Sequence, residues 1–151
     1  MPATRRRFLS LGLMAGFALA AAPLRAAGPG ISTGKTGVAI QGYDSHAYWA
    51  AGAPRPGDPA FTIDWQGVPW HFATRADADA FAAAPESFAP QFGGFCTRAM
   101  SLGSVVDGDP EVWRVFEGRL YLFARPVGGR KFDGAEAEMI AKAQAHWDSL
   151  H

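Results

Sequence analysis

A cysteine, a methionine and two histidines are the side chains with the clearest chemical potential in this sequence. Cys96 is the single cysteine of the chain, which excludes an intramolecular disulfide. Met100 follows four residues later, so a helix would place both sulfur atoms on one face. A thiolate beside a thioether suits a soft ion such as Cu(I), and histidine is a common further ligand. The sequence therefore predicts a candidate copper site formed by Cys96, Met100, His71 and His46.

These four residues also have plainer interpretations. Free cysteine and methionine often fill cores, so Cys96 and Met100 could simply be packed. His71 alternates with two aromatic residues along a strand and would face outward if they are buried, and His46 could lie on a surface helix. A thiol in the first turn of a helix also leaves a redox or nucleophilic role open. No hydrolase or zinc-protease motif is present, so we predict no catalytic residue and favour binding over catalysis.

Two short segments could contact a ligand through their backbone. Gly93 and Gly94 would let a ligand approach closely, and a helix that follows them would present free N–H groups to an anion. A turn with positive φ explains the two glycines equally well. Tyr43 and Asp44 could bind a ligand or anchor their own turn through local hydrogen bonds. The candidate ligand-binding residues are therefore Tyr43, Asp44, Gly93 and Gly94.

Hairpins and short helices must position these residues. Segments 61–72 and 112–123 each contain an aromatic and β-branched run, a tight turn ending in glycine, and a second run, which is typical of a hairpin. Apart from the two hairpins, no longer repeat is evident. Helices are expected over 45–51, 75–84, 95–102 and 133–148. Because helices and strands do not alternate regularly, we predict an α+β domain with a small antiparallel sheet built from the two hairpins.

Capping residues define the expected ends of these elements. Thr74, with Asp77 three residues later, predicts the start of the second helix. Asp133 is the expected cap of the last helix. Asp109, followed by proline, is interpreted as a cap after a turn, since the acidic run around it lacks the ligand spacing of a calcium loop. Residues 38–40 are expected to form a short strand.

The first 27 residues resemble a twin-arginine export signal. Three arginines are followed by Phe-Leu and by an apolar run over 8–22, which is shorter than the ~20 residues that span a bilayer. Small residues then allow cleavage near Ala26 or Ala27. We therefore expect the folded protein to be exported to the periplasm, with no membrane association after the signal is removed. Residues 28–37 are expected to be a flexible leader, and 38–151 the domain.

The composition and net charge of the chain limit the kinds of partner that we expect it to bind. A chain of 151 residues with 48% hydrophobic residues supports one packed domain. Four of the 14 basic residues and none of the 14 acidic ones lie in the first 27 residues, so ten basic residues remain against 14 acidic ones. A domain with a net charge of −4 gains nothing from phosphate backbones, so nucleic acid is excluded as an expected partner. A metal ion or small ligand is expected instead, and the sequence names no protein partner.

The sequence resembles the YHS-domain family, and its exported, twin-arginine-signalled branch in particular. The resemblance covers residues 38–150, and the matching residues are Gly42, Tyr43, Asp44, Trp70, His71, Phe72, Phe81, Pro85, Phe88 and the segment 90–96. The resemblance implies that this chain has the fold of that family. It also implies heavy-metal binding, which is suspected for the family. However, the paired cysteines of the metal-binding versions fall on Ala73 and Asp77 here, so that metal site is absent.

Three functions follow as hypotheses. The first is a module centred on Cys96 that binds or handles a soft metal such as copper. The second is a non-catalytic ligand- or protein-interaction module in which Cys96 is buried. The third is a thiol-based redox protein. The first two are favoured over the third.

Overall fold

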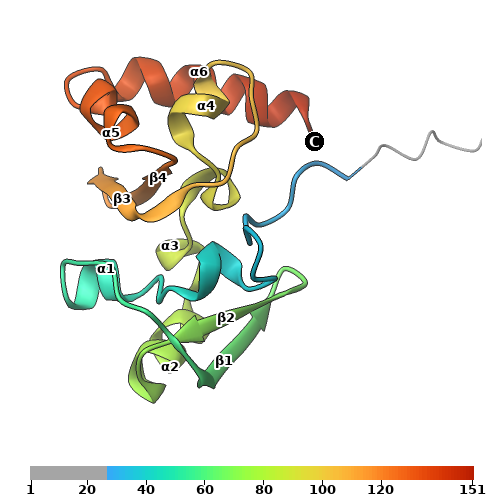
Figure 1. Cartoon of the computed structure of the whole chain (residues 1–151), viewed down its shortest axis with the longest axis vertical. Helices are drawn as coiled ribbons and strands as arrows, with labels where there is room; N and C mark the ends of the chain where they lie inside the picture. Colours follow the sequence, from blue (N-terminus) through green and yellow to red (C-terminus); the bar gives the residue numbers. More distant parts are fainter. Residues whose placement is uncertain (1–26) are drawn as a thin grey trace, which may run out of the picture.

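The computed structural model describes residues 27–151, which form an α+β arrangement (Figure 1). Strands β1 (Asp58–Trp65) and β2 (Val68–Phe72) form one antiparallel hairpin, and β3 (Asp109–Phe116) and β4 (Arg119–Phe123) form the other. The predicted fold class and both hairpins are therefore confirmed, with each hairpin making a two-stranded sheet of its own. The predicted export signal lies almost wholly outside the described residues.

Short helices connect and cover the hairpins. Their bounds are η1 (Ala39–Gly42), α1 (Ala47–Ala50), α2 (Arg75–Ala83), α3 (Pro85–Phe88), η2 (Gln91–Gly94), α4 (Thr97–Ser101), α5 (Pro126–Phe132) and α6 (Glu136–Ser149). Thr74 caps α2 as predicted, because its side chain accepts a hydrogen bond from the Asp77 amide. Within residues 27–151, no helix has the length and apolar character needed to cross a bilayer.

Three local predictions are wrong. Residues 39–42 form the 3₁₀ turn η1 and not a strand, because Ile40 and Gln41 adopt positive φ. Asp109 begins strand β3, where it pairs with Phe123, and does not cap a helix. Asp133 follows the end of α5, and its carboxylate binds Arg114 instead of capping the last helix.

The chain folds the same succession of elements twice. The first repeat (residues 39–83) contains η1, α1, β1, β2 and α2, and the second repeat (residues 91–132) contains η2, α4, β3, β4 and α5. Both hairpins carry the same irregularity in register, between Asp58 and Thr62 in one and between Asp109 and Trp113 in the other. The expectation that no repeat extends beyond the hairpins is therefore wrong.

Backbone details establish which residues correspond between the repeats. The Asp44 amide donates to the Arg55 carbonyl at 2.8 Å, as the Cys96 amide does to the Val106 carbonyl at 2.7 Å. Shortly after these two carbonyls in the sequence, Gly57 and Gly108 occupy equivalent positions, where an added side chain would clash with backbone atoms. A Cβ on Gly57 would lie 2.5 Å from a backbone carbon of β2, and one on Gly108 would lie 2.5 Å from the carbonyl oxygen at the end of η2. Asp44 and Cys96 are thus counterparts.

The two repeats pack through strand β4, which is buried on both faces. Leu120 and Leu122 enter the core of the first repeat, whereas Tyr121 and Phe123 enter the core of the second. Helix α6 is much longer than α3, which follows α2, and it covers the second core with a face that includes the fully buried Ala143. Figure 1 shows α6 lying across α4 and α5 at the end of the molecule opposite β1 and β2.

The segment expected to be a flexible leader contributes contacts at its centre. Ser32 is buried, its amide donates to the Gly93 carbonyl, and its carbonyl accepts from the Ile40 amide, both at 2.8 Å. Its hydroxyl also donates to a carboxylate oxygen of Asp107 at 2.6 Å. Ser32 therefore links η1 of the first repeat to η2 of the second.

Candidate functional site

The four predicted metal ligands fall on two parts of the molecule. Cys96 and Met100 belong to the second core, where Met100 is fully buried and Cys96 is 4% exposed. His46 contacts Asp77 in the first repeat, and His71 lies on β2 against η1 and Gly57. Among residues 27–151, no three or more His, Cys, Asp and Glu side chains gather in a way that could hold a metal ion. The structure brings the two sulfur residues together in one cluster and places the histidines elsewhere.

Cys96 precedes α4 as its N-cap, one position before the expected first turn. Its sulfur accepts a hydrogen bond from the Ala99 amide at 3.4 Å, and its carbonyl accepts from the Met100 amide at 2.9 Å. The thiol is therefore held at the start of the helix, and its backbone is fixed on both sides.

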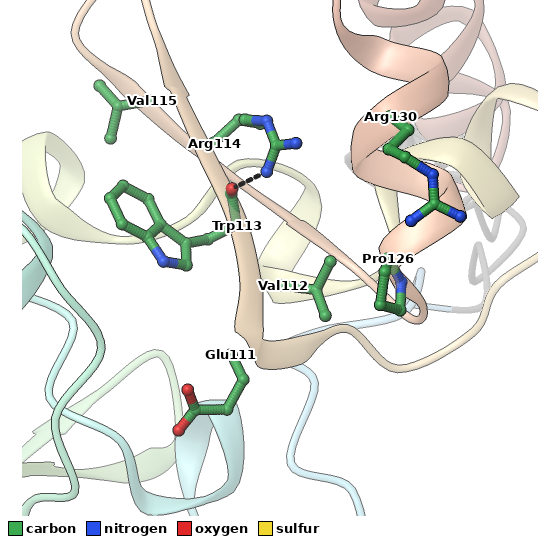
Figure 2. Close-up of a pocket in the computed structure, with 7 residues that line it drawn as sticks. All are labelled: Glu111, Val112, Trp113, Arg114, Val115, Pro126 and Arg130. Carbon is green, nitrogen blue, oxygen red and sulfur yellow. Dashed lines mark hydrogen bonds between the residues drawn. The ribbon is translucent and has the colours of Figure 1, made fainter.

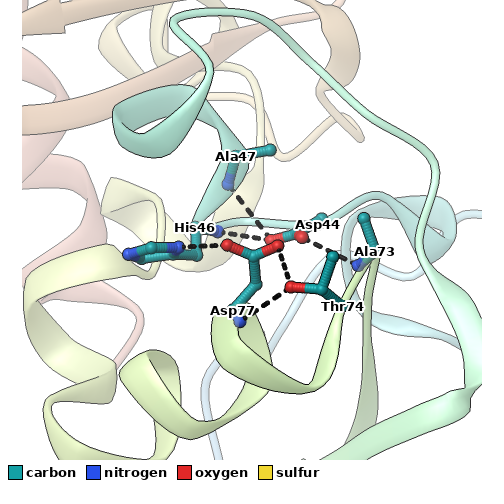
Figure 3. Close-up of polar contacts among 6 residues, drawn as sticks. All are labelled: Asp44, His46, Ala47, Ala73, Thr74 and Asp77. Atoms are coloured by element: carbon teal, nitrogen blue, oxygen red, sulfur yellow. Dashed lines mark hydrogen bonds and ion pairs between the residues drawn. The ribbon is translucent and has the colours of Figure 1, made fainter.

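Asp44 occupies the corresponding position in the first repeat and is fully buried (Figure 3). One carboxylate oxygen accepts from the amides of His46 and Ala47 at 2.8 and 3.1 Å, and the other accepts from the Ala73 amide at 2.8 Å. Burial raises the pKa of Asp44, and the three amide bonds oppose that shift because they favour the carboxylate. These bonds bear out the interpretation in which Asp44 anchors its own turn.

A second carboxylate lies beside Asp44 in the first repeat. Asp77 accepts a hydrogen bond from the Thr74 hydroxyl at 2.6 Å through one oxygen, and the other lies 2.7 Å from Nδ1 of His46 (Figure 3). Burial opposes ionisation of Asp77, but the bonds from Thr74 and His46 prevail and hold its pKa below the ordinary value. The space between α1 and α2 is thus filled by an internally paired carboxylate.

The remaining predicted ligand-binding residues also make internal contacts. The Tyr43 hydroxyl donates to Glu111 at 2.7 Å, which joins the two repeats. Gly93 and Gly94 both have positive φ, and a Cβ on Gly94 would lie 2.8 Å from the Ile40 side chain. A turn with positive φ and close packing therefore accounts for the glycine pair.

The second repeat has a pocket in the place that the Asp77 carboxylate fills in the first. We call it the Cys96 pocket; its volume is about 210 Å³ and its lining residues are Cys96, Arg98, Ala99, Leu102, Val106, Ala124, Arg125, Val127 and Gly128. By the correspondence of the repeats, the counterpart of Asp77 is Gly128, which has no side chain. A glycine therefore lines this pocket where the first repeat has an aspartate.

The Cys96 pocket gathers most of the exposed apolar side chains of the described chain. Of the five large hydrophobic residues exposed in residues 27–151, Leu102, Val106 and Val127 line the pocket and Val105 adjoins it. Leu102 is 70% exposed. Scattered apolar residues need no explanation, but a group of them at one hollow is typical of a binding surface. Sequence reasoning missed these residues.

The polar groups of the Cys96 pocket are cationic or donors. Arg98 and Arg125 line it, and neither forms an ion pair with a carboxylate of residues 27–151. The Ala124 amide corresponds to the Ala73 amide that binds Asp44, yet it makes no hydrogen bond with another described residue. The pocket therefore combines an apolar wall with unpaired donors, and it can accept an anionic group.

A larger hollow of about 500 Å³ lies along β3 and the start of α5 (Figure 2). Its polar groups are mostly engaged. Arg114 binds both oxygens of Asp133 at 2.7 and 2.8 Å and donates to the Trp113 carbonyl, and Glu111 accepts from Tyr43. Among its lining residues, Arg130 is the cation without a carboxylate partner in the described part of the chain. This hollow is larger than the Cys96 pocket. In the described part of the chain, it has one lining cation without a carboxylate partner, whereas the Cys96 pocket has two.

Comparison with known proteins adds no further evidence on the site. No protein-family model, no curated protein and no solved structure matches this chain. Its function is therefore inferred from the residues and their geometry.

Proposed function

We propose that this chain is an exported, non-catalytic binding module and that the Cys96 pocket holds its ligand. The observation that carries the proposal is the grouping, around one pocket, of exposed apolar side chains and two arginines that have no carboxylate partner among residues 27–151. Exposing such a group to water is unfavourable unless a ligand covers it for part of the time. The twin-arginine pattern and the resemblance to exported YHS-domain proteins support the location.

The surroundings of Cys96 favour binding over thiol catalysis. A nucleophilic cysteine needs a base within hydrogen-bond reach, roughly 2.6–3.2 Å. In the described part of the chain, the hydrogen-bond partner of the Cys96 sulfur is the Ala99 amide, while His46 is engaged with Asp77. Cys96 therefore serves as a pocket wall in this proposal.

A neutral apolar dye tests the proposal. Nile red should gain fluorescence on the purified protein, and replacing Leu102 with Ser should weaken its binding. Val115→Ser is the matched control, because Val115 is also an exposed hydrophobic residue but lies on β3, away from the Cys96 pocket. Binding that is absent, or that is lost equally in both variants, would contradict the proposal.

Soft-metal binding is the second candidate. The observation in its favour is that Cys96 and Met100 share one core cluster, and a thiolate with a thioether suits Cu(I). Elemental mass spectrometry of protein purified without a histidine tag tests it. Near-stoichiometric copper that is lost in Cys96→Ser would support this function over ligand binding, and copper at background level after growth in added copper would count against it.

A further inference from the structure

We propose that the ligand of the Cys96 pocket is a small apolar monocarboxylate whose carboxylate binds between Arg98 and Arg125. This inference rests on the proposed function and names the ligand class of the same pocket. It follows from the internal repeat, because the first repeat fills the corresponding space with carboxylates of its own.

The first repeat holds a carboxylate of its own at this position. The Asp77 carboxylate is held there by His46 from the start of α1 and by Thr74 from the cap of α2, at 2.7 and 2.6 Å (Figure 3). Asp44 supplies the acceptor for the Ala73 amide. This position of the fold therefore accommodates a carboxylate group between a short helix and the helix that follows the hairpin.

In the second repeat, the residues that correspond to this carboxylate and its partners are different. The counterparts of His46 and Thr74 are the two arginines Arg98 and Arg125, which strengthen the preference for an anion. The counterpart of Asp77 is Gly128, so the carboxylate itself is missing. Two residues able to donate charge-assisted hydrogen bonds thus line a space in which the chain has no carboxylate of its own.

The Ala124 amide is a further hydrogen-bond donor at the pocket. In the first repeat, one Asp44 oxygen accepts from the helix start and the other accepts from Ala73. The Cys96 sulfur replaces only the first of these acceptors, through its bond from Ala99. Ala124 lines the pocket with its N–H unpaired among the described residues, and such a group is stabilised by a bound acceptor.

The apolar wall defines the rest of the ligand. Val106 and Val127 stand where the first repeat has Arg55 and Ala76, and Leu102 projects beside them. These side chains suit a short hydrocarbon tail. A cavity of about 150 Å³ can hold a molecule the size of benzene, so a pocket of about 210 Å³ suits a chain of a few carbons.

Titration of the ¹⁵N-labelled protein with hexanoate and with 1-hexanol, followed by NMR, tests the inference. The two probes share a tail and differ in charge. We expect hexanoate to bind at least about tenfold more tightly, as the loss of a charge-assisted hydrogen bond would imply. Equal affinities would overturn the carboxylate inference and leave the proposed function standing, whereas binding of neither probe nor Nile red would overturn both.

Variants locate the charge effect. Arg98→Gln with Arg125→Gln should remove the tenfold preference for hexanoate and spare hexanol binding. Arg130→Gln is the matched control, because Arg130 is a further arginine of the second repeat that lines the other hollow. An equal loss in the control would assign the preference to general positive charge and overturn the inference. The comparison of the two probes on the unmodified protein stands even if the double variant fails to fold.

Discussion

The two repeats share a backbone but differ in what lies between the short helix and the helix after the hairpin. In the first repeat, Asp44 and Asp77 fill this space and satisfy the surrounding donors. In the second, Cys96 and Gly128 line a pocket whose two arginines have no carboxylate partner in the described part of the chain. The first repeat is therefore closed by its own carboxylates, and we propose that the second is open to a ligand.

The cores of the two repeats differ because helix α6 covers the second one. The second repeat is covered by α6 on the side away from the first repeat, and the aromatic residue Trp147 packs there against Phe92 and Phe95. The pocket therefore lies on a unit supported by an additional helix and by the buried strand β4.

The largest expected effect concerns the closed repeat. Asp44→Ala leaves the amides of His46, Ala47 and Ala73 without their acceptor, so it should lower the free energy of unfolding by about 3 kcal/mol or more. Cys96→Ala removes one weak hydrogen bond and little volume and should cost only about 1 kcal/mol. Urea denaturation of both variants measures the difference, and equal losses would contradict the structural contrast between the repeats.

Gly128→Asp should make the second repeat resemble the first. The new carboxylate would face Arg98 and Arg125, so hexanoate affinity should fall by at least about tenfold. A modest loss of stability should accompany it, because the added Cβ would lie 3.1 Å from Phe123. NMR titration measures the affinity, with Asp77→Asn in the closed repeat as a control that should bind normally. Unchanged affinity in Gly128→Asp would place the ligand elsewhere.

The smallest effect is a pH dependence that Asp77 contributes in the closed repeat. The folded pKa of Asp77 lies below its ordinary value of 3.8, so the unfolded chain binds the proton more readily. The stability that ionised Asp77 contributes is therefore complete above pH 3.8 and is lost as the pH falls through the folded pKa. The urea midpoint of the unmodified protein should exceed that of Asp77→Asn at neutral pH, and this gap should narrow in acid. A gap that stays constant down to pH 3 would be inconsistent with the lowered pKa.

Local signals in the sequence predicted much of the fold. Aromatic runs around tight glycine turns identified both hairpins, and Thr74 located the start of α2. The repeat was missed because most side chains differ between the copies. The recurrence of Gly-Asp-Pro at 57–59 and 108–110 is a signal that could have revealed it.

The pocket was harder to predict than the fold. It depends on a missing side chain at Gly128 and on the exposure of Leu102, and neither feature produces a periodic pattern. Cys96, which the sequence singled out as a metal ligand, lines this pocket. The sequence also singled out Asp44, but the correspondence between Asp44 and Cys96 appears only when the two backbones are compared.

The most direct test of the central claim is a crystal structure of the protein with hexanoate. Our account predicts that the carboxylate lies between Arg98 and Arg125, near the Ala124 amide, with the hydrocarbon chain against Leu102 and Val127. Hexanoate bound instead in the hollow along β3, or a Cys96 pocket that stays empty at saturating concentration, would contradict the claim that the second repeat is the binding half of the molecule.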